Sequence, residues 1–146
     1  MTEMVHGQGL AVLPATYRVV LCDIWGCVHN GIRVFPEAQQ LLTRWVGQGR
    51  IVLLLTNAPR PAGAVCRQLT GLGLDRASYS GVITSGDAGV AALLDEGRAD
   101  VGFIGTEADR AILEESGLKL LEGPVGDAVV CTGLNERQTD PSDYDA

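Results

Sequence analysis

Short apolar segments alternate with amphipathic segments along most of the chain. Runs whose length and composition suit strands buried on both faces occupy residues 17–23, 51–57, 81–85, 101–105 and 127–131. Between them, apolar residues recur at helical spacing, which predicts helices over residues 36–46, 61–72, 86–94 and 107–116. This alternation is typical of an α/β fold with a parallel sheet and right-handed crossovers.

Composition narrows the class of protein further. Hydrophobic residues make up 46% and charged residues 20% of the chain, the balance of a globular protein. The formal net charge of −7 argues against a nucleic-acid partner, which normally requires a basic face. The apolar runs are too short to cross a membrane, and residues 1–15 predict a loose leader rather than a secretory signal.

The number and spacing of the cysteines indicate the redox compartment of the protein. The four cysteines form no Cys-x-x-Cys pair, so we expect buried, reduced thiols in a cytoplasmic protein rather than disulfides or a zinc site. Among the other side chains, we expect Trp45 in the core of the protein and Arg50 in solvent. Residues 138–146 predict a frayed acidic tail.

Polar residues stand directly at the ends of the first two predicted strands. Asp23 ends the first strand, and Thr56 and Asn57 end the second. Ligands of open parallel sheets gather at the carboxyl ends of the strands. A carboxylate there can act as a nucleophile or bind a hard cation, and a loop opened by Gly26 can direct backbone N–H groups at a phosphate. The alternative is that Asp23 only caps the turn predicted over residues 24–34.

Two segments carry a resemblance to a known family. Residues 19–31 (VVLCDIWGCVHNG) resemble the first motif of the haloacid dehalogenase superfamily, and residues 52–60 (VLLLTNAPR) resemble the second. Residues 36–38 and 82–88 are similar to the class IIA branch, which includes sugar-phosphatase and nitrophenyl-phosphatase-like members. The resemblance covers residues 17–144. It implies a Rossmann-like parallel sheet with an incomplete core over residues 16–95 and part of an inserted α/β cap over residues 96–146.

The resemblance also implies a reaction, namely the Mg²⁺-dependent hydrolysis of a small phosphorylated molecule through an aspartyl-phosphate. By its position in the motifs, Asp23 is the expected nucleophile and a metal ligand, and the backbone carbonyl of Trp25 is a second metal ligand. The phosphoryl oxygens are expected on the Gly26 N–H, Thr56 and Asn57. A cation and oriented donors are needed because a carboxylate otherwise repels an anionic phosphate.

Two further residues are candidates for substrate contact. His29 lies in the loop after Asp23, and the alternative for it is an exposed turn histidine. Arg60 follows the Thr-Asn pair and can meet an anionic group of the substrate. The alternative for Arg60 is a surface arginine at the entry of a helix.

The chain departs from the family pattern at three places. Trp25 stands where the family has an aspartate as general acid, and the loss of such a group usually costs about 10²–10⁴-fold in rate. Lys119, the only lysine, falls in the cap region, where we expect a solvated side chain. Asp87 resembles the start of the fourth motif, but Ala91 replaces the second carboxylate.

These departures suggest an N-terminal fragment that ends inside the cap. Such a fragment would expose apolar surface and strand edges, and we expect it to associate with a missing C-terminal half or to form a homo-oligomer. A non-catalytic module that binds Mg²⁺ and phosphate is the alternative function. A nucleotide- or flavin-binding module ranks last, because neither a Gly-x-Gly-x-x-Gly pattern after the first strand nor a Walker loop is present.

Overall fold

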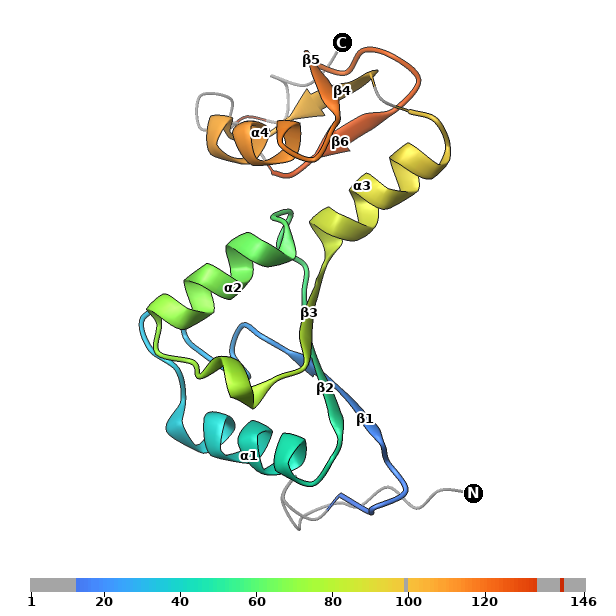
Figure 1. Cartoon of the computed structure of the whole chain (residues 1–146). Coiled ribbons are helices and arrows are strands. Elements are labelled where there is room, and N and C mark those ends of the chain that lie inside the picture. The colour runs from blue at the N-terminus through green and yellow to red at the C-terminus, as the bar shows by residue number, and fades with distance from the viewer. Residues whose placement is uncertain (1–12, 99, 134–139, 141–146) are drawn as a thin grey trace. The chain divides into compact units, whose positions relative to one another are not determined.

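The structure is a computed structural model that describes residues 13–98, 100–133 and 140. Its strands and helices follow one another in the predicted alternating order as far as residue 114, and a strand that was not predicted (Lys119–Glu122) then precedes the last strand (Figure 1). The chain divides into two compact units. The first contains the described residues up to Thr56 together with Val65–Ile83, and the second contains Asn57–Ala64 and the described residues from Thr84 onward.

The first unit is built on a three-stranded sheet in the order β1-β2-β3. Its strands are β1 (Val19–Asp23), β2 (Ile51–Thr56) and β3 (Gly81–Thr84). Strands β1 and β2 are parallel, as predicted. Helices α1 (Pro36–Gly47) and α2 (Ala62–Gly71) lie on the same side of this sheet (Figure 1).

The core of this unit lies between the sheet and the two helices. Val52 and Leu54 of β2 are fully buried, as is Leu69 of α2. Trp45 of α1 is 3% exposed, which confirms its predicted place in the core. Burial of these side chains is the main force that holds the helices on the sheet, because each contributes about 1.5–3 kcal/mol.

The other face of the sheet is open. Val19, Leu21, Ile51 and Ile83 are each 45–60% exposed. This exposure shows that α1 and α2 leave these side chains uncovered. Exposed apolar surface was expected from the sequence, and the structure confirms it.

The second unit is built on a separate three-stranded sheet, in the order β5-β4-β6. Strand β4 (Asp100–Ile104) is parallel to both β5 (Lys119–Glu122) and β6 (Val129–Cys131). Helices α3 (Ser85–Asp95) and α4 (Glu107–Glu114) complete this unit. None of the helices in the described residues is long and apolar enough to span a bilayer.

The core of the second unit explains why α3 belongs to it. The buried cluster consists of Val101, Phe103, Leu113, Leu118 and Leu120. Two side chains of α3, Val90 and Leu93, pack against this cluster. The division between the two compact units therefore falls before α3.

Arg50 and the cysteines differ from the sequence-based expectation. Arg50 is 9% exposed rather than solvated, because its guanidinium donates hydrogen bonds to the backbone carbonyls of Tyr17 and Leu13 at 3.0 and 2.9 Å. The expectation of buried thiols is wrong for Cys27 and Cys131, which are exposed. All four cysteines are free thiols, as expected.

The loop that follows Thr56 is fastened to the first turn of α3. The Ser85 hydroxyl donates to the backbone carbonyls of Asn57 and Ala58 at 2.8 and 3.0 Å. The loop also passes very close to Gly86, where a Cβ atom would lie 2.4 Å from the carbonyl oxygen of Pro59. Glycine is therefore required at position 86, and Gly86 lets α3 position the backbone next to the strand end.

A pair of substitutions in α3 tests this close approach. Gly86→Ala is expected to lower the free energy of unfolding by about 1–3 kcal/mol, because backbone atoms must move to admit the methyl group. Gly89→Ala, with no atom within 4 Å of the new Cβ, is expected to raise it by about 0.5–1 kcal/mol through helix propensity. Urea denaturation measures both changes. Equal shifts of the two midpoints in one direction would contradict the proposed contact.

Candidate functional site

The register of β1 and β2 brings two predicted site residues to one edge of the sheet. Asp23 pairs with Leu55, and the N–H of Ile24 donates to the carbonyl of Leu55 at 3.1 Å. Thr56 is the next residue, so it ends β2 at the same edge where Asp23 ends β1. Asp23 is exposed and Thr56 is half-buried. Asn57 follows Thr56 directly in the chain and is exposed.

The loop after Asp23 closes on itself through several backbone hydrogen bonds, two of which involve His29. The N–H of Gly26 donates to the carbonyl of His29 at 2.9 Å, and the N–H of His29 donates to the carbonyl of Ile24 at 3.3 Å. Gly26 has a φ of +77°, a left-handed conformation that favours glycine. The Gly26 N–H must therefore exchange its partner before it can hold a phosphoryl oxygen. Neither bond involves the carbonyl of Trp25.

His29 supports the loop from inside. Its side chain is buried, with 3% exposure, so the alternative of an exposed turn histidine is wrong. Its Nδ1 accepts a hydrogen bond from the N–H of Gly31 at 2.9 Å and therefore carries no proton. The imidazole also meets the ring of Trp25 edge-on, with ring centroids 5.5 Å apart. In this arrangement His29 shapes the turn from its buried side.

Arg60 is engaged in an ion pair within the second unit. Its Nε lies 3.7 Å from Oδ1 of Asp109. The other carboxylate oxygen of Asp109 accepts hydrogen bonds from the hydroxyls of Thr106 and Thr132 at 3.0 and 3.2 Å. Sequence reasoning missed this cluster. The Thr-x-x-Asp pattern at the start of α4 was the available signal, because it is a variant of the helix capping box.

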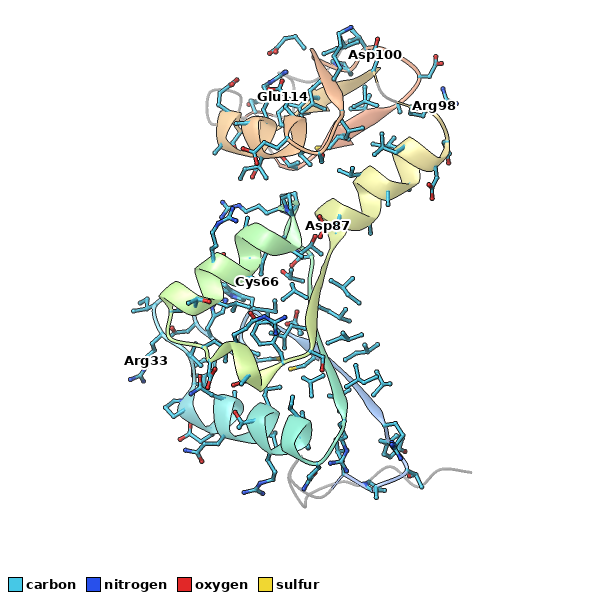
Figure 2. The ribbon with its side chains drawn as sticks, in the orientation of Figure 1. Arg33, Cys66, Asp87, Arg98, Asp100 and Glu114 are labelled. Atoms are coloured by element: carbon cyan, nitrogen blue, oxygen red, sulfur yellow. The ribbon has the colours of Figure 1, made fainter. Side chains whose placement is uncertain are left out.

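Two charged residues that resembled later motifs have structural partners. The Asp87 carboxylate accepts a hydrogen bond from the N–H of Ala62 at 2.8 Å, and Figure 2 shows Asp87 at the beginning of α3. Lys119 is 70% exposed and forms an ion pair with Asp100 at 3.3 Å. The expectation that Lys119 is a solvated lysine is confirmed.

Cys22 is the other side chain at this strand end that could act as a nucleophile. Burial raises the pKa of its thiol, and the neighbouring Cys27 and Asp23 raise it further. A thiol with a raised pKa stays protonated near neutral pH and is a poor nucleophile. Asp23 is therefore the better candidate for attack on an electrophile at this strand end.

The oxygen atoms at the strand end fit a magnesium ion. The residues that would hold it are Asp23, through its exposed carboxylate, and Trp25, through its backbone carbonyl. Magnesium usually keeps several water ligands and takes one or two carboxylates from the protein, so two protein oxygens are sufficient. Among the described residues, no three side chains of His, Cys, Asp or Glu gather into a metal cluster, at the strand end or elsewhere.

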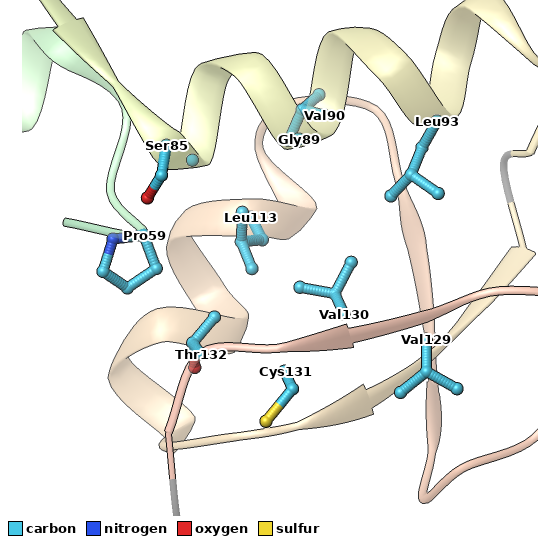
Figure 3. Close-up of a pocket in the computed structure, with 11 residues that line it drawn as sticks. Pro59, Ser85, Gly89, Val90, Leu93, Leu113, Val129, Val130, Cys131 and Thr132 are labelled. Atoms are coloured by element: carbon cyan, nitrogen blue, oxygen red, sulfur yellow. The ribbon is translucent and has the colours of Figure 1, made fainter. Parts of the chain in front are cut away.

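A cavity of about 340 Å³ lies within the second unit, between α3 and β6 (Figure 3). Most of its lining is apolar, from side chains such as Val90, Leu93 and Leu113. None of the predicted site residues lines it.

A family model described as haloacid dehalogenase-like hydrolase matches residues 20–119. The chain belongs to this family. Of the two segments that carried the resemblance, the match includes the first from residue 20 and the whole of the second, and it includes all residues of the strand-end site. The family and the α/β fold that the motifs implied are thus confirmed for this haloacid dehalogenase-like chain.

Solved structures show the same relationship. A haloacid dehalogenase-like hydrolase from Brucella suis is 38% identical over 88% of this chain, with a TM-score of 0.75. A glycerol phosphate phosphatase from Mycobacterium tuberculosis, solved in complex with magnesium, is 31% identical over 88% of the chain, with a TM-score of 0.57. A 4-nitrophenylphosphatase from Thermotoga maritima, 21% identical over 80% of this chain and 45% of its own, shares the fold with a TM-score of 0.66.

The chain spans only about half or less of the length of these solved structures. This haloacid dehalogenase-like chain spans 49% of the Brucella suis chain and 40% of the Mycobacterium tuberculosis chain. No curated protein sequence matches it.

Proposed function

We propose that the chain acts in the Mg²⁺-dependent hydrolysis of small phosphorylated metabolites, with Asp23 as the nucleophile. The observation that carries this proposal is the register of β1 and β2, which brings an exposed carboxylate and a hydroxyl to one sheet edge. The magnesium complex of the 31% identical glycerol phosphate phosphatase supports it. The proposal includes residues 16–95 as part of the catalytic core, residues 96–146 as part of a cap, and a cytoplasmic location.

The proposed reaction has two steps at Asp23. A carboxylate oxygen of Asp23 attacks the phosphorus atom, the bond between phosphorus and the leaving oxygen breaks, and an aspartyl-phosphate forms. Water then attacks phosphorus, which releases inorganic phosphate and restores the carboxylate. The side chains of Thr56 and Asn57 donate hydrogen bonds to the phosphoryl oxygens. Bound magnesium supplies the positive charge that offsets repulsion between the two anions.

Trp25 removes general acid–base catalysis from the family mechanism and leaves the nucleophilic attack by Asp23. Its indole has no proton that it can give to a leaving oxygen and no basic atom that can take one from water. Leaving groups must therefore depart as anions or take a proton from solvent. This observation favours a second candidate function, in which the site binds magnesium and a phosphate ester without turnover.

The test is phosphate release by the full chain with 4-nitrophenyl phosphate. Hydrolysis is expected in the presence of Mg²⁺, because the charge on both reactants must be offset, and it is expected to stop when EDTA removes the metal and to return when Mg²⁺ is restored. Titration calorimetry with the same ester separates the two candidates. Binding without phosphate release supports the non-catalytic module, and the absence of both contradicts each of them.

A further inference from the structure

Trp25 is a large apolar side chain that stands in water beside the proposed nucleophile. Its side chain is 64% exposed, whereas Trp45, the other tryptophan, is 3% exposed in the core. Trp25 follows Asp23 by two residues, and this spacing allows at most about 7 Å between their Cα atoms. An exposed indole this close in the chain can reach the group to which a phosphate held at Asp23 is attached.

The turn that follows Trp25 holds the indole in place. A Cβ atom at Gly31 would lie 2.6 and 2.9 Å from two carbons of the indole ring, so the ring packs directly on the Gly31 backbone. The buried ring of His29 meets the indole at an interplanar angle of 85°. Nδ1 of His29 also accepts a hydrogen bond from the N–H of Gly31. His29 therefore holds both the indole and the Gly31 backbone on which the indole packs. A surface held in this way loses little conformational freedom when a ligand binds.

We infer that the Trp25 indole determines the specificity of this site and selects phosphate monoesters whose leaving group is a planar aromatic ring. The inference rests on the function proposed above. An exposed indole stacks on planar rings in offset or edge-to-face geometry.

The absence of an acid at position 25 points to the same class of substrate. A phenolic leaving oxygen, with a pKa of about 10 in tyrosine, departs as a stable anion, whereas an alkyl alcohol needs a proton in the transition state. The stacking surface and the missing proton donor therefore come from a single residue and favour aryl over alkyl esters.

The test uses two phosphonates that cannot be hydrolysed. Phenylphosphonate and methylphosphonate share the anionic group and differ in the ring. With Mg²⁺ present, the full chain is expected to bind phenylphosphonate about 5–150-fold more tightly, the range measured for one aromatic stacking contact. Quenching of tryptophan fluorescence should accompany phenylphosphonate binding. In Trp25→Leu this ratio of dissociation constants is expected to fall toward one, and Trp25→Phe should retain part of it.

Ile32→Ala provides the matched control. Ile32 is 83% exposed in the same turn, so its removal takes away a comparable apolar side chain and should leave the ratio unchanged. Equal affinity of the wild-type chain for the two phosphonates overturns the inference but leaves the phosphate site intact. An unchanged ratio in Trp25→Leu, with normal circular dichroism, overturns the role of Trp25. If neither phosphonate binds, the proposed function itself fails.

Discussion

Replacement of Asp23 by Asn is expected to lower kcat/KM for 4-nitrophenyl phosphate by more than about 10³-fold. The neutral amide oxygen is a much weaker nucleophile than a carboxylate, and it no longer offers a negative charge to the metal. Asp23 is exposed at the end of β1, so the substitution should leave the fold intact. The measurement is steady-state phosphate release at saturating Mg²⁺, with circular dichroism as the check on folding.

Asp95→Asn is the control for this loss. Asp95 is also exposed, but it ends α3 in the second unit and has no place in the proposed site. The same change of charge there should leave the rate unaltered. Mass spectrometry of the acid-quenched reaction should also find a phosphorylated Asp23 in the wild-type chain. Full activity in Asp23→Asn would show that the strand-end carboxylate is not the nucleophile.

Trp25→Asp is expected to raise kcat for glycerol phosphate by about 10²–10⁴-fold, the usual contribution of a general acid. An aspartate at this position can deliver a proton to an alkyl leaving oxygen, which is a poor leaving group as an anion. The rate with 4-nitrophenyl phosphate should change far less, because that leaving group needs no proton. The measurement is the ratio of kcat values for the two esters.

Trp25→Asn separates the effect of a new proton donor from the effect of a smaller side chain at position 25. Asparagine matches aspartate in size but carries no carboxyl proton, so its rate with glycerol phosphate should stay near that of the wild type. Equal gains in Trp25→Asp and Trp25→Asn would attribute the effect to space freed by removal of the indole. No gain in Trp25→Asp would mean that a proton at this position does not limit the reaction.

Local patterns predicted most of the fold because the apolar runs that form the strands are continuous in sequence. Strand β5 was missed, since only Leu120 and Leu121 are apolar in its four residues. Its extended conformation depends on pairing with β4, a contact between residues far apart in the chain. Burial of Arg50 has the same origin, because the carbonyls that it binds precede β1.

The candidate site was predictable to the extent that it follows from strand ends. Asp23 and Thr56 share an edge because parallel strands in register end together. The arrangement of Trp25, His29 and Gly31 was not predictable, since it depends on a buried imidazole and a left-handed glycine inside one turn. A histidine followed two residues later by a glycine is not a recognised sequence pattern for a turn that supports an aromatic ring.

The bare apolar side of the first sheet, with Val19, Leu21, Ile51 and Ile83, affects how stability must be measured. Two molecules that cover this side against each other remove apolar area from water, and mass action then favours the folded pair at higher protein concentration. The denaturation midpoint would rise as the solution becomes more concentrated. Variants of α3 should therefore be compared at one fixed concentration and again after tenfold dilution.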